Sequence, residues 1–275
     1  MSSIRILLGV AVLMALGSAY ADTTLTFDDG RRPDATSFLI KDGKVLMQGK
    51  GPQGGEYASI YDSNKNHFLV VDYGHQNYYI MDKALIDKQM KAMDSMREQM
   101  KQNMQAQIQQ MPEEQRKMME QRMNTMLNPP KPPALKITDT SKTENINGIS
   151  CKVFEVYRGE EAIREVCVAP ISAIKMPDAD YKTLRSMFAY MKDMAESMAK
   201  KSPMAGNDGA IMADMEGVPV EMRDLRKDFV SRLEGVSTKE INPKLFEIPA
   251  SFKEVDPYAM MQQQMQQMQQ MHKPQ

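Results

Sequence analysis

The sequence predicts an α+β fold that combines an antiparallel β-sheet with long, methionine-rich helices. From 22 to 82, short apolar and β-branched runs alternate with turns, which is typical of successive strands. From 83 to 110 there is no glycine, proline or aromatic residue, and apolar residues recur every three or four positions, which is typical of a helix. The chain contains 28 methionines and no tryptophan, so methionine must supply much of the helical apolar surface.

The first 21 residues have the pattern of a cleaved secretory signal peptide. Arg5 precedes an apolar run, 6–16, and Ala19 and Ala21 supply the small residues that signal peptidase recognises. The run is too short to span a hydrocarbon core, which needs about 20 residues. We therefore expect cleavage after Ala21, a mature chain that begins at Asp22, no transmembrane anchor after cleavage, and a periplasmic or secreted protein.

The segment that follows predicts a meander of five or six strands. Asp42-Gly43 is a typical hairpin turn between two apolar runs, and a polar turn, 62–66, separates the next two. The predicted strands after the first are 36–40, 44–48, 56–61, 67–73 and 77–81.

Residues 83–128 predict a helical hairpin inserted into an otherwise β-rich chain. Pro112 ends the first helix, a second helix runs from 113 to 127, and prolines between 129 and 133 end the unit. The first helix carries one apolar stripe, formed by Ile86, Met90, Met93, Met100, Met104, Ile108 and Met111. This stripe must be buried, either on the sheet of the same chain or on another protein.

The two cysteines predict one structural disulfide. Cys151 and Cys167 lie in two β-type runs, each eight positions from Gly159, so a hairpin would place them nearly opposite each other. Directly opposed residues have Cα atoms about 4.5 to 5.5 Å apart, which a disulfide can bridge. A catalytic pair more often has Cys-x-x-Cys spacing at a helix start.

The remainder of the chain completes a single domain, 22–257. A helix is expected at 181–201, with late strands at 217–224 and 229–241. Residues 258–275 form a methionine- and glutamine-rich tail of low complexity.

Three groups of segments together resemble an uncharacterised family of secreted bacterial proteins, a domain of unknown function related to the LolA/LolB-like half-barrel of outer-membrane lipoprotein carriers. The segments are 41–45 with 57–62 and 79–82, then 147–151 with 165–169, and finally 245–249. In this order they cover most of 23–255. The helical insert and the tail have no match in the carrier group.

The resemblance implies a strongly curved antiparallel half-barrel sheet with helices in or over its concave face. Relatives with known roles carry lipids or lipoprotein acyl chains, so we expect non-catalytic binding of an apolar, lipid-like or lipoprotein-like ligand. Such sites are lined by aromatic and aliphatic side chains. The candidate lining residues are Phe38, Ile40, Tyr57, Leu69, Val71, Tyr79 and Ile80.

Composition and motifs argue against several other functions. With 35 basic and 36 acidic residues, the chain lacks the basic excess expected of a nucleic-acid-binding protein. We find no phosphate-binding glycine loop, no nucleophile elbow and no histidine-rich metal spacing. His75 follows Asp72 in a turn, but a lone histidine and carboxylate lack a nucleophile. We expect no enzymatic activity and no cofactor.

Two alternative functions follow from the methionines. Met261, Met265, Met268 and His272 would share one face of a helical tail, and thioethers are soft ligands that prefer Cu(I). Alternatively, the hairpin at 83–128 binds an envelope protein through its apolar stripe. The same stripes are also typical of ordinary packing faces.

Overall fold

The computed structural model describes residues 22–30, 36–50, 54–127, 132–201, 210–260 and 262. Among these residues, one 12-stranded sheet has the order β12-β6-β5-β4-β3-β2-β1-β11-β10-β9-β8-β7, so its two ends do not meet. Neighbouring strands are antiparallel except β12, which is parallel to β6. The strands are β1 (Thr23–Asp28), β2 (Thr36–Lys41), β3 (Lys44–Lys50), β4 (Glu56–Asp62), β5 (His67–Asp72), β6 (Asn77–Met81), β7 (Leu135–Ile146), β8 (Ile149–Arg158), β9 (Glu161–Ala169), β10 (Val218–Asp224), β11 (Phe229–Ser237) and β12 (Lys253–Glu254).

The helices are α1 (Lys83–Gln109), α2 (Glu113–Leu127), α3 (Ile171–Ile174) and α4 (Asp178–Lys201), with two short 3-10 helices, η1 (Ala210–Asp214) and η2 (Pro243–Phe246). The α+β class and the large curved sheet predicted from the sequence are confirmed. Strands β1 to β6 form the expected meander, and pairing of β1 with β11 joins this meander to the later strands.

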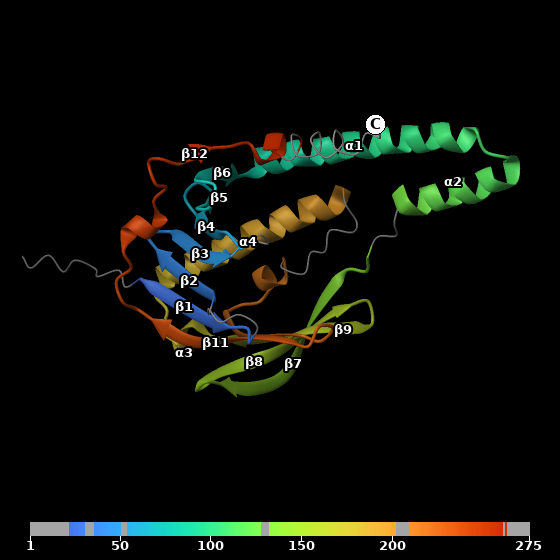
Figure 1. Cartoon of the computed structure of the whole chain (residues 1–275). Coiled ribbons are helices and arrows are strands. Elements are labelled where there is room, and N and C mark those ends of the chain that lie inside the picture. The colour runs from blue at the N-terminus through green and yellow to red at the C-terminus, as the bar shows by residue number, and fades with distance from the viewer. Residues whose placement is uncertain are drawn as a thin grey trace, which may run out of the picture.

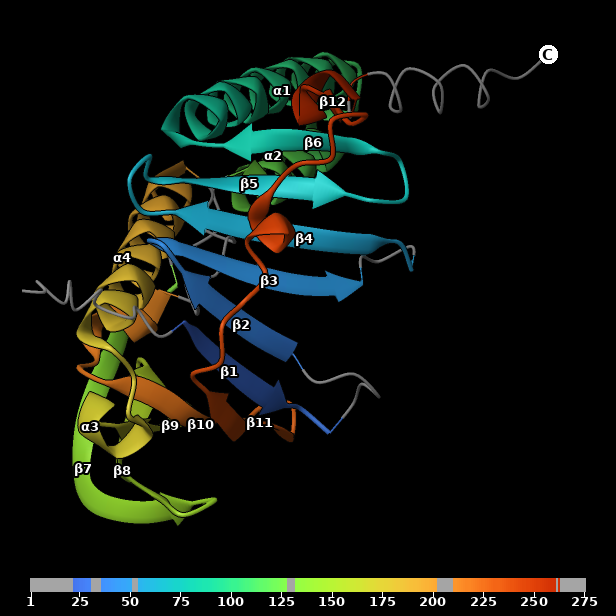
Figure 2. The same cartoon turned by 90° about the vertical axis from the view of Figure 1, so that its left-hand side faces the viewer.

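The sheet curves around α4, which lies against its concave face (Figure 1). The other face, called here the outer face, is crossed by the segment 238–252 between β11 and β12 (Figure 2). The start of this segment is held by Asp22, whose carboxylate accepts hydrogen bonds from the Lys41 ammonium at 2.8 Å and from the Ile241 amide at 2.6 Å. The sheet is therefore covered by protein on both faces.

Helices α1 and α2 lie between β6 and β7 and extend away from the sheet (Figure 1). Asp82 caps α1 by accepting a hydrogen bond from the Leu85 amide at 2.8 Å. The last turns of α1 pack on α2 through Ile108 and Met123. Near the sheet, Ile86 and Met90 are buried, so the predicted stripe packs on this chain at both ends of α1.

The predicted disulfide is present between Cys151 of β8 and Cys167 of β9, with Cα atoms 5.4 Å apart. The two cysteines are not directly opposite each other, because Cys167 is paired with Val153, which is two positions from Cys151. The turn consists of Gly159 and Glu160, between paired Arg158 and Glu161, and a bulge between Val156 and Tyr157 shifts the register.

Within the described ranges, no helix is both long and apolar enough to cross a membrane. The predicted signal peptide, 1–21, lies outside the residues that the structure describes.

Candidate functional site: an apolar cavity under α4

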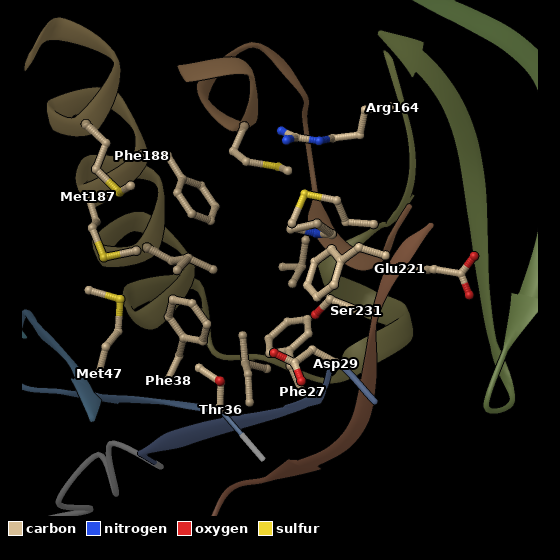
Figure 3. Close-up of a pocket in the computed structure, with 18 residues that line it drawn as sticks. Phe27, Asp29, Thr36, Phe38, Met47, Arg164, Met187, Phe188, Glu221 and Ser231 are labelled. Carbon is tan, nitrogen blue, oxygen red and sulfur yellow. The ribbon is translucent and has the colours of Figure 1, made fainter. Parts of the chain in front are cut away.

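A cavity of about 430 Å³ lies between the concave face of the sheet and the helices α4 and η1. Its size falls within the range of roughly 300 to 1,000 Å³ that is typical of small-molecule sites. Figure 3 shows the side chains around it. They are Leu25, Phe27, Asp29, Thr36, Phe38, Met47, Arg164, Leu184, Met187, Phe188, Met191, Met212, Val218, Pro219, Glu221, Met222, Phe229 and Ser231.

The floor of the cavity is formed by alternate residues of β1 and β2 and by β3. Leu25 and Phe27 are two positions apart and point to the same face. The rings of Phe27 and Phe38 meet edge to face, with centroids 5.6 Å apart, an arrangement that aromatic rings prefer. Phe38 is in turn paired with Met47 across β2 and β3. The floor is therefore a continuous apolar surface over three strands.

The wall contributed by α4 is one stripe of its surface. Leu184, Met187, Phe188 and Met191 occur at intervals that place them on a single helical face. Leu184 and Met187 are 1% and 0% exposed, whereas Phe188 and Met191 are partly buried.

Three hydrogen bonds fix α4 over the sheet. Thr23 of β1 donates to the Asp180 carboxylate at 2.6 Å, Tyr190 donates to the Met81 carbonyl at 3.0 Å, and the hydroxyl groups of Tyr61 and Ser186 lie 2.7 Å apart. Because these contacts join α4 to β1, β4 and β6, they hold the helix at a set distance above the cavity. Burial raises the pKa of Asp180, an effect that the hydrogen bond from Thr23 opposes.

The roof is η1, which Arg185 of α4 holds in place. The guanidinium donates to the Met212 carbonyl at 3.1 Å and to the Ala213 carbonyl at 2.7 Å, and a further hydrogen bond goes to Met215. Lys192 of α4 also pairs with Asp214. These contacts keep the Met212 side chain over the cavity.

Three charged residues lie in the lining. Arg164 is paired with Asp224, with a nitrogen-to-oxygen distance of 3.7 Å. Glu221 accepts hydrogen bonds from the guanidinium groups of Arg223 and Arg232. The third, Asp29, lies near Phe27 in Figure 3, on the opposite side of the cavity from Arg164. The lining is thus apolar with charges at separated points.

The structure divides the seven predicted lining residues between the two faces. Phe38 lines the cavity, and Ile40, fully buried, lies in the same concave-face core. Tyr57 and Tyr79 also lie on this face, as strand alternation and their partners Asp72 and Val70 indicate, but they are not in the cavity lining.

Leu69, Val71 and Ile80 lie on the outer face. Leu69 and Val71 belong to a core that Ile241 and Phe246 of the crossing segment complete. Ile80 is paired with Leu69 and so shares its face. These three side chains cannot contact a ligand in the concave cavity while the fold is intact.

Most of the lining comes from residues that sequence reasoning did not propose. Leu184, Met187, Phe188 and Met191 recur with a helical period in the sequence, but nothing local distinguishes a cavity wall from a packed core. The contributions of β10 and β11, such as Met222 and Ser231, depend on pairing between distant segments.

Met261, Met265, Met268 and His272 lie outside the described residues. Within the described part of the chain, no group of three or more histidine, cysteine, aspartate or glutamate side chains could hold a metal ion.

Asp72 binds the ring of His75 through Nδ1 at 2.8 Å. Burial raises the pKa of Asp72, but hydrogen bonds from Tyr57 and from the amide and ring of His75 outweigh it and lower the pKa overall. The histidine is 64% exposed, and this cluster is not part of the cavity lining.

The chain matches no protein-family model and no curated protein. Its function must therefore be argued from the site itself.

Proposed function

We propose that this protein is a non-catalytic binding protein of the cell envelope that holds an apolar, lipid-like or lipoprotein-like chain in the cavity under α4. The observation that carries the proposal is the cavity lining, in which phenylalanine, leucine and methionine side chains from the sheet and α4 enclose about 430 Å³. Transfer of a methylene group from water into such a site contributes about 0.8 kcal/mol. An apolar chain is the ligand class that this lining favours.

The fold supports the same proposal. A curved, open antiparallel sheet with α4 in its concavity is what resemblance to the LolA/LolB-like carriers leads us to expect. Methionine side chains from α4, such as Met187 and Met191, line the cavity, and flexible thioether chains adapt to ligands of different shape. The location in the envelope rests on the signal-peptide pattern and on the disulfide.

Filling the cavity tests this function directly. Ser231 of β11 lines the cavity, so Ser231→Phe places a ring in the ligand space. The matched control is Ser237→Phe, on the same strand but outside the cavity. Purified protein is stripped of lipid and titrated with the apolar fluorescent probe N-phenylnaphthylamine, and native mass spectrometry of untreated protein reports any bound ligand.

We expect saturable probe binding to the unmodified protein and to Ser237→Phe, and loss of binding in Ser231→Phe with an unchanged circular dichroism spectrum. Equal probe binding in both variants would place the apolar site elsewhere. An absence of both probe binding and co-purifying lipid would refute the proposal.

A second candidate function is protein–protein interaction through α1 and α2. These helices extend away from the sheet (Figure 1), and several of their methionines have exposed side chains. They are Met93, Met96, Met100, Met118 and Met126, each between 43% and 54% exposed. Replacing Met93, Met96 and Met100 by glutamine keeps helix propensity, so an interaction through this face would be lost in cross-linking experiments while cavity binding is retained.

A further inference from the structure

The exposed apolar surface of α1 and α2 consists of methionine. Among the side chains that the structure describes on these two helices, every large apolar one that is exposed is a methionine. These residues, called here the outward methionines, are 43% to 54% exposed: Met93, Met96, Met100, Met118 and Met126. The isoleucines of α1, Ile86 and Ile108, are instead buried. Methionine therefore supplies the outward apolar positions, and isoleucine is confined to the inward ones.

Helix propensity does not account for methionine at the outward positions. Leucine, glutamine, lysine and glutamate form helices about as well as methionine does, and the polar residues among them would leave no apolar surface in water. Methionine differs from all of them in its thioether sulfur, which an oxidant converts to the sulfoxide. The property that distinguishes the outward positions is therefore chemical reactivity.

The thioethers are the most readily oxidised side chains of this protein. The chain contains no tryptophan, and its two cysteines, Cys151 and Cys167, are joined in the disulfide. No thiol is left to react ahead of methionine. Oxidant that reaches the protein therefore reacts at thioethers first, and exposure decides which of them it meets.

Oxidation at the outward positions spares the contacts that hold α1 and α2. A sulfoxide is polar and disrupts an apolar core, but the core contacts of these helices are made by other side chains, Ile86 and Met90 near the sheet and Ile108 with Met123 between the helices. Both helices extend away from the sheet (Figure 1), and none of the outward methionines lines the cavity. The two helices can therefore be oxidised without loss of the fold.

We propose that α1 and α2 form a site of reversible methionine oxidation, at which the outward methionines consume two-electron oxidants of the hypochlorous acid class. The sulfur lone pair attacks the chlorine of hypochlorous acid, water then forms the sulfur–oxygen bond, and chloride leaves. In sum, a thioether and hypochlorous acid give a sulfoxide, chloride and a proton, so that sulfur loses the two electrons that chlorine gains. Methionine sulfoxide reductases reverse the oxidation, with one enzyme for each sulfoxide epimer. This activity does not depend on ligand binding in the cavity.

The first test maps the reaction residue by residue in the unmodified protein. Folded protein is treated near neutral pH with less than one equivalent of hypochlorous acid per methionine, and sulfoxide is measured by mass spectrometry of peptides. Met90 and Met123 are internal controls, since they lie on the same helices but are each 5% exposed. We expect the outward methionines to react about tenfold or more faster than these two, because a buried thioether reacts only when the structure opens.

At the dose that oxidises the outward methionines alone, the circular dichroism spectrum should not change, and the two reductases with a reductant should restore the original mass. Equal rates at outward and buried methionines would overturn the inference, as would unfolding at this dose. Neither result requires a variant to fold.

Variants test whether the sulfur atoms protect cells. Leucine at all the outward positions keeps their apolar surface and helix propensity but removes the sulfur. Met90→Leu/Met123→Leu is the matched control, which keeps the outward sulfur atoms. Cells that produce each form in place of their own copy are exposed to hypochlorous acid, and survival and sulfoxide in the isolated protein are measured.

We expect sulfoxide at the outward methionines of the unmodified protein, and lower survival with the outward leucine variant than with the matched control. Equal survival with these two forms would overturn the inference. Outward methionines that stay reduced in the treated cells would also overturn it, because a bound partner would then cover this face. Because the leucine variant keeps the apolar surface, a loss of protection there is a loss of sulfur and not of a docking face.

Discussion

Removal of the disulfide should destabilise this protein by an amount that the fold allows us to estimate. The bond joins β8 to β9 across a sequence separation of 16 residues. In the chain-entropy model, a cross-link that closes a loop of about 15 residues stabilises the folded state by about 3 kcal/mol, because it restricts the unfolded chain. Cys151 and Cys167 are 2% and 4% exposed, so reductant reaches the bond mainly through the unfolded state.

The assay is urea unfolding of the oxidised protein, of the same protein unfolded in reductant, and of a Cys151→Ala/Cys167→Ala variant. A loss of about 3 kcal/mol corresponds to a decrease in Tm of about 6 to 12 °C for a chain of this length. The oxidised and reduced forms differ in the cross-link alone, so their difference isolates the restriction of the unfolded chain. The double variant should be at least as unstable, because it also loses packing by two buried sulfur atoms.

The reasoning is refuted if the oxidised and reduced proteins unfold at the same urea concentration. Insensitivity of the double variant to reductant is the control that assigns the effect to this bond. Thiol titration of the unreduced, denatured protein should detect no free cysteine, and detection of two would contradict the disulfide itself.

Three further predictions concern the surroundings of the cavity. Burial raises the pKa of the Asp180 carboxyl in the folded protein above its value in the unfolded chain. The contribution of Asp180 to stability is therefore present at acidic pH and is lost as pH rises through the folded pKa. In melting curves measured across pH, Asp180→Asn should show a smaller loss of stability with rising pH. Gly217 has φ of +120°, and a Cβ there would lie 2.5 Å from the Ala169 carbonyl oxygen, so Gly217→Ala should lower the free energy of unfolding by about 1–3 kcal/mol or more in urea titrations. Phe246→Ala should lower the free energy of unfolding by about 3–5 kcal/mol, because Phe246 belongs to the outer-face core, while the folded variant still binds the apolar probe; loss of probe binding would show that the two faces are coupled.

Elements that depend on neighbouring residues could be predicted from the sequence. Asp42 and Gly43 both have positive φ, 49° and 75°, and join paired Lys41 and Lys44, as expected of a two-residue hairpin turn. Helix α1 begins directly after Asp82, which caps it. In each case a local rule is sufficient, because the residues that decide the conformation are within a few positions of one another.

Pairing between distant segments could not be predicted. Strand β1 pairs with β11, and a bulge between Thr26 and Phe27 interrupts the register. Nothing in either segment specifies the other as its partner, since apolar alternation is common to many strands of the chain. The cavity depends on this pairing, because β11 and β10 supply one of its sides.

The sequence does not tell the two faces of the sheet apart, for a related physical reason. In a sheet with one face in water, alternation separates buried from exposed residues. Here α4 covers the concave face and the segment 238–252 covers the outer face, so apolar residues occupy both sets of alternate positions. Phe38 on one face and Leu69 on the other therefore look alike in the sequence.

Methionine has two distinct environments in this protein, and they call for separate explanations. Around the cavity, side chains such as Met187 and Met212 form part of the wall; on α1, Met93 and Met100 are 43% exposed. A wall of branched or aromatic side chains would fix the shape of the cavity, whereas unbranched thioether chains adapt to different contents. Such a wall suits apolar chains of several shapes. The exposed methionines of α1 are not in the cavity lining, so their apolar surface needs a separate explanation.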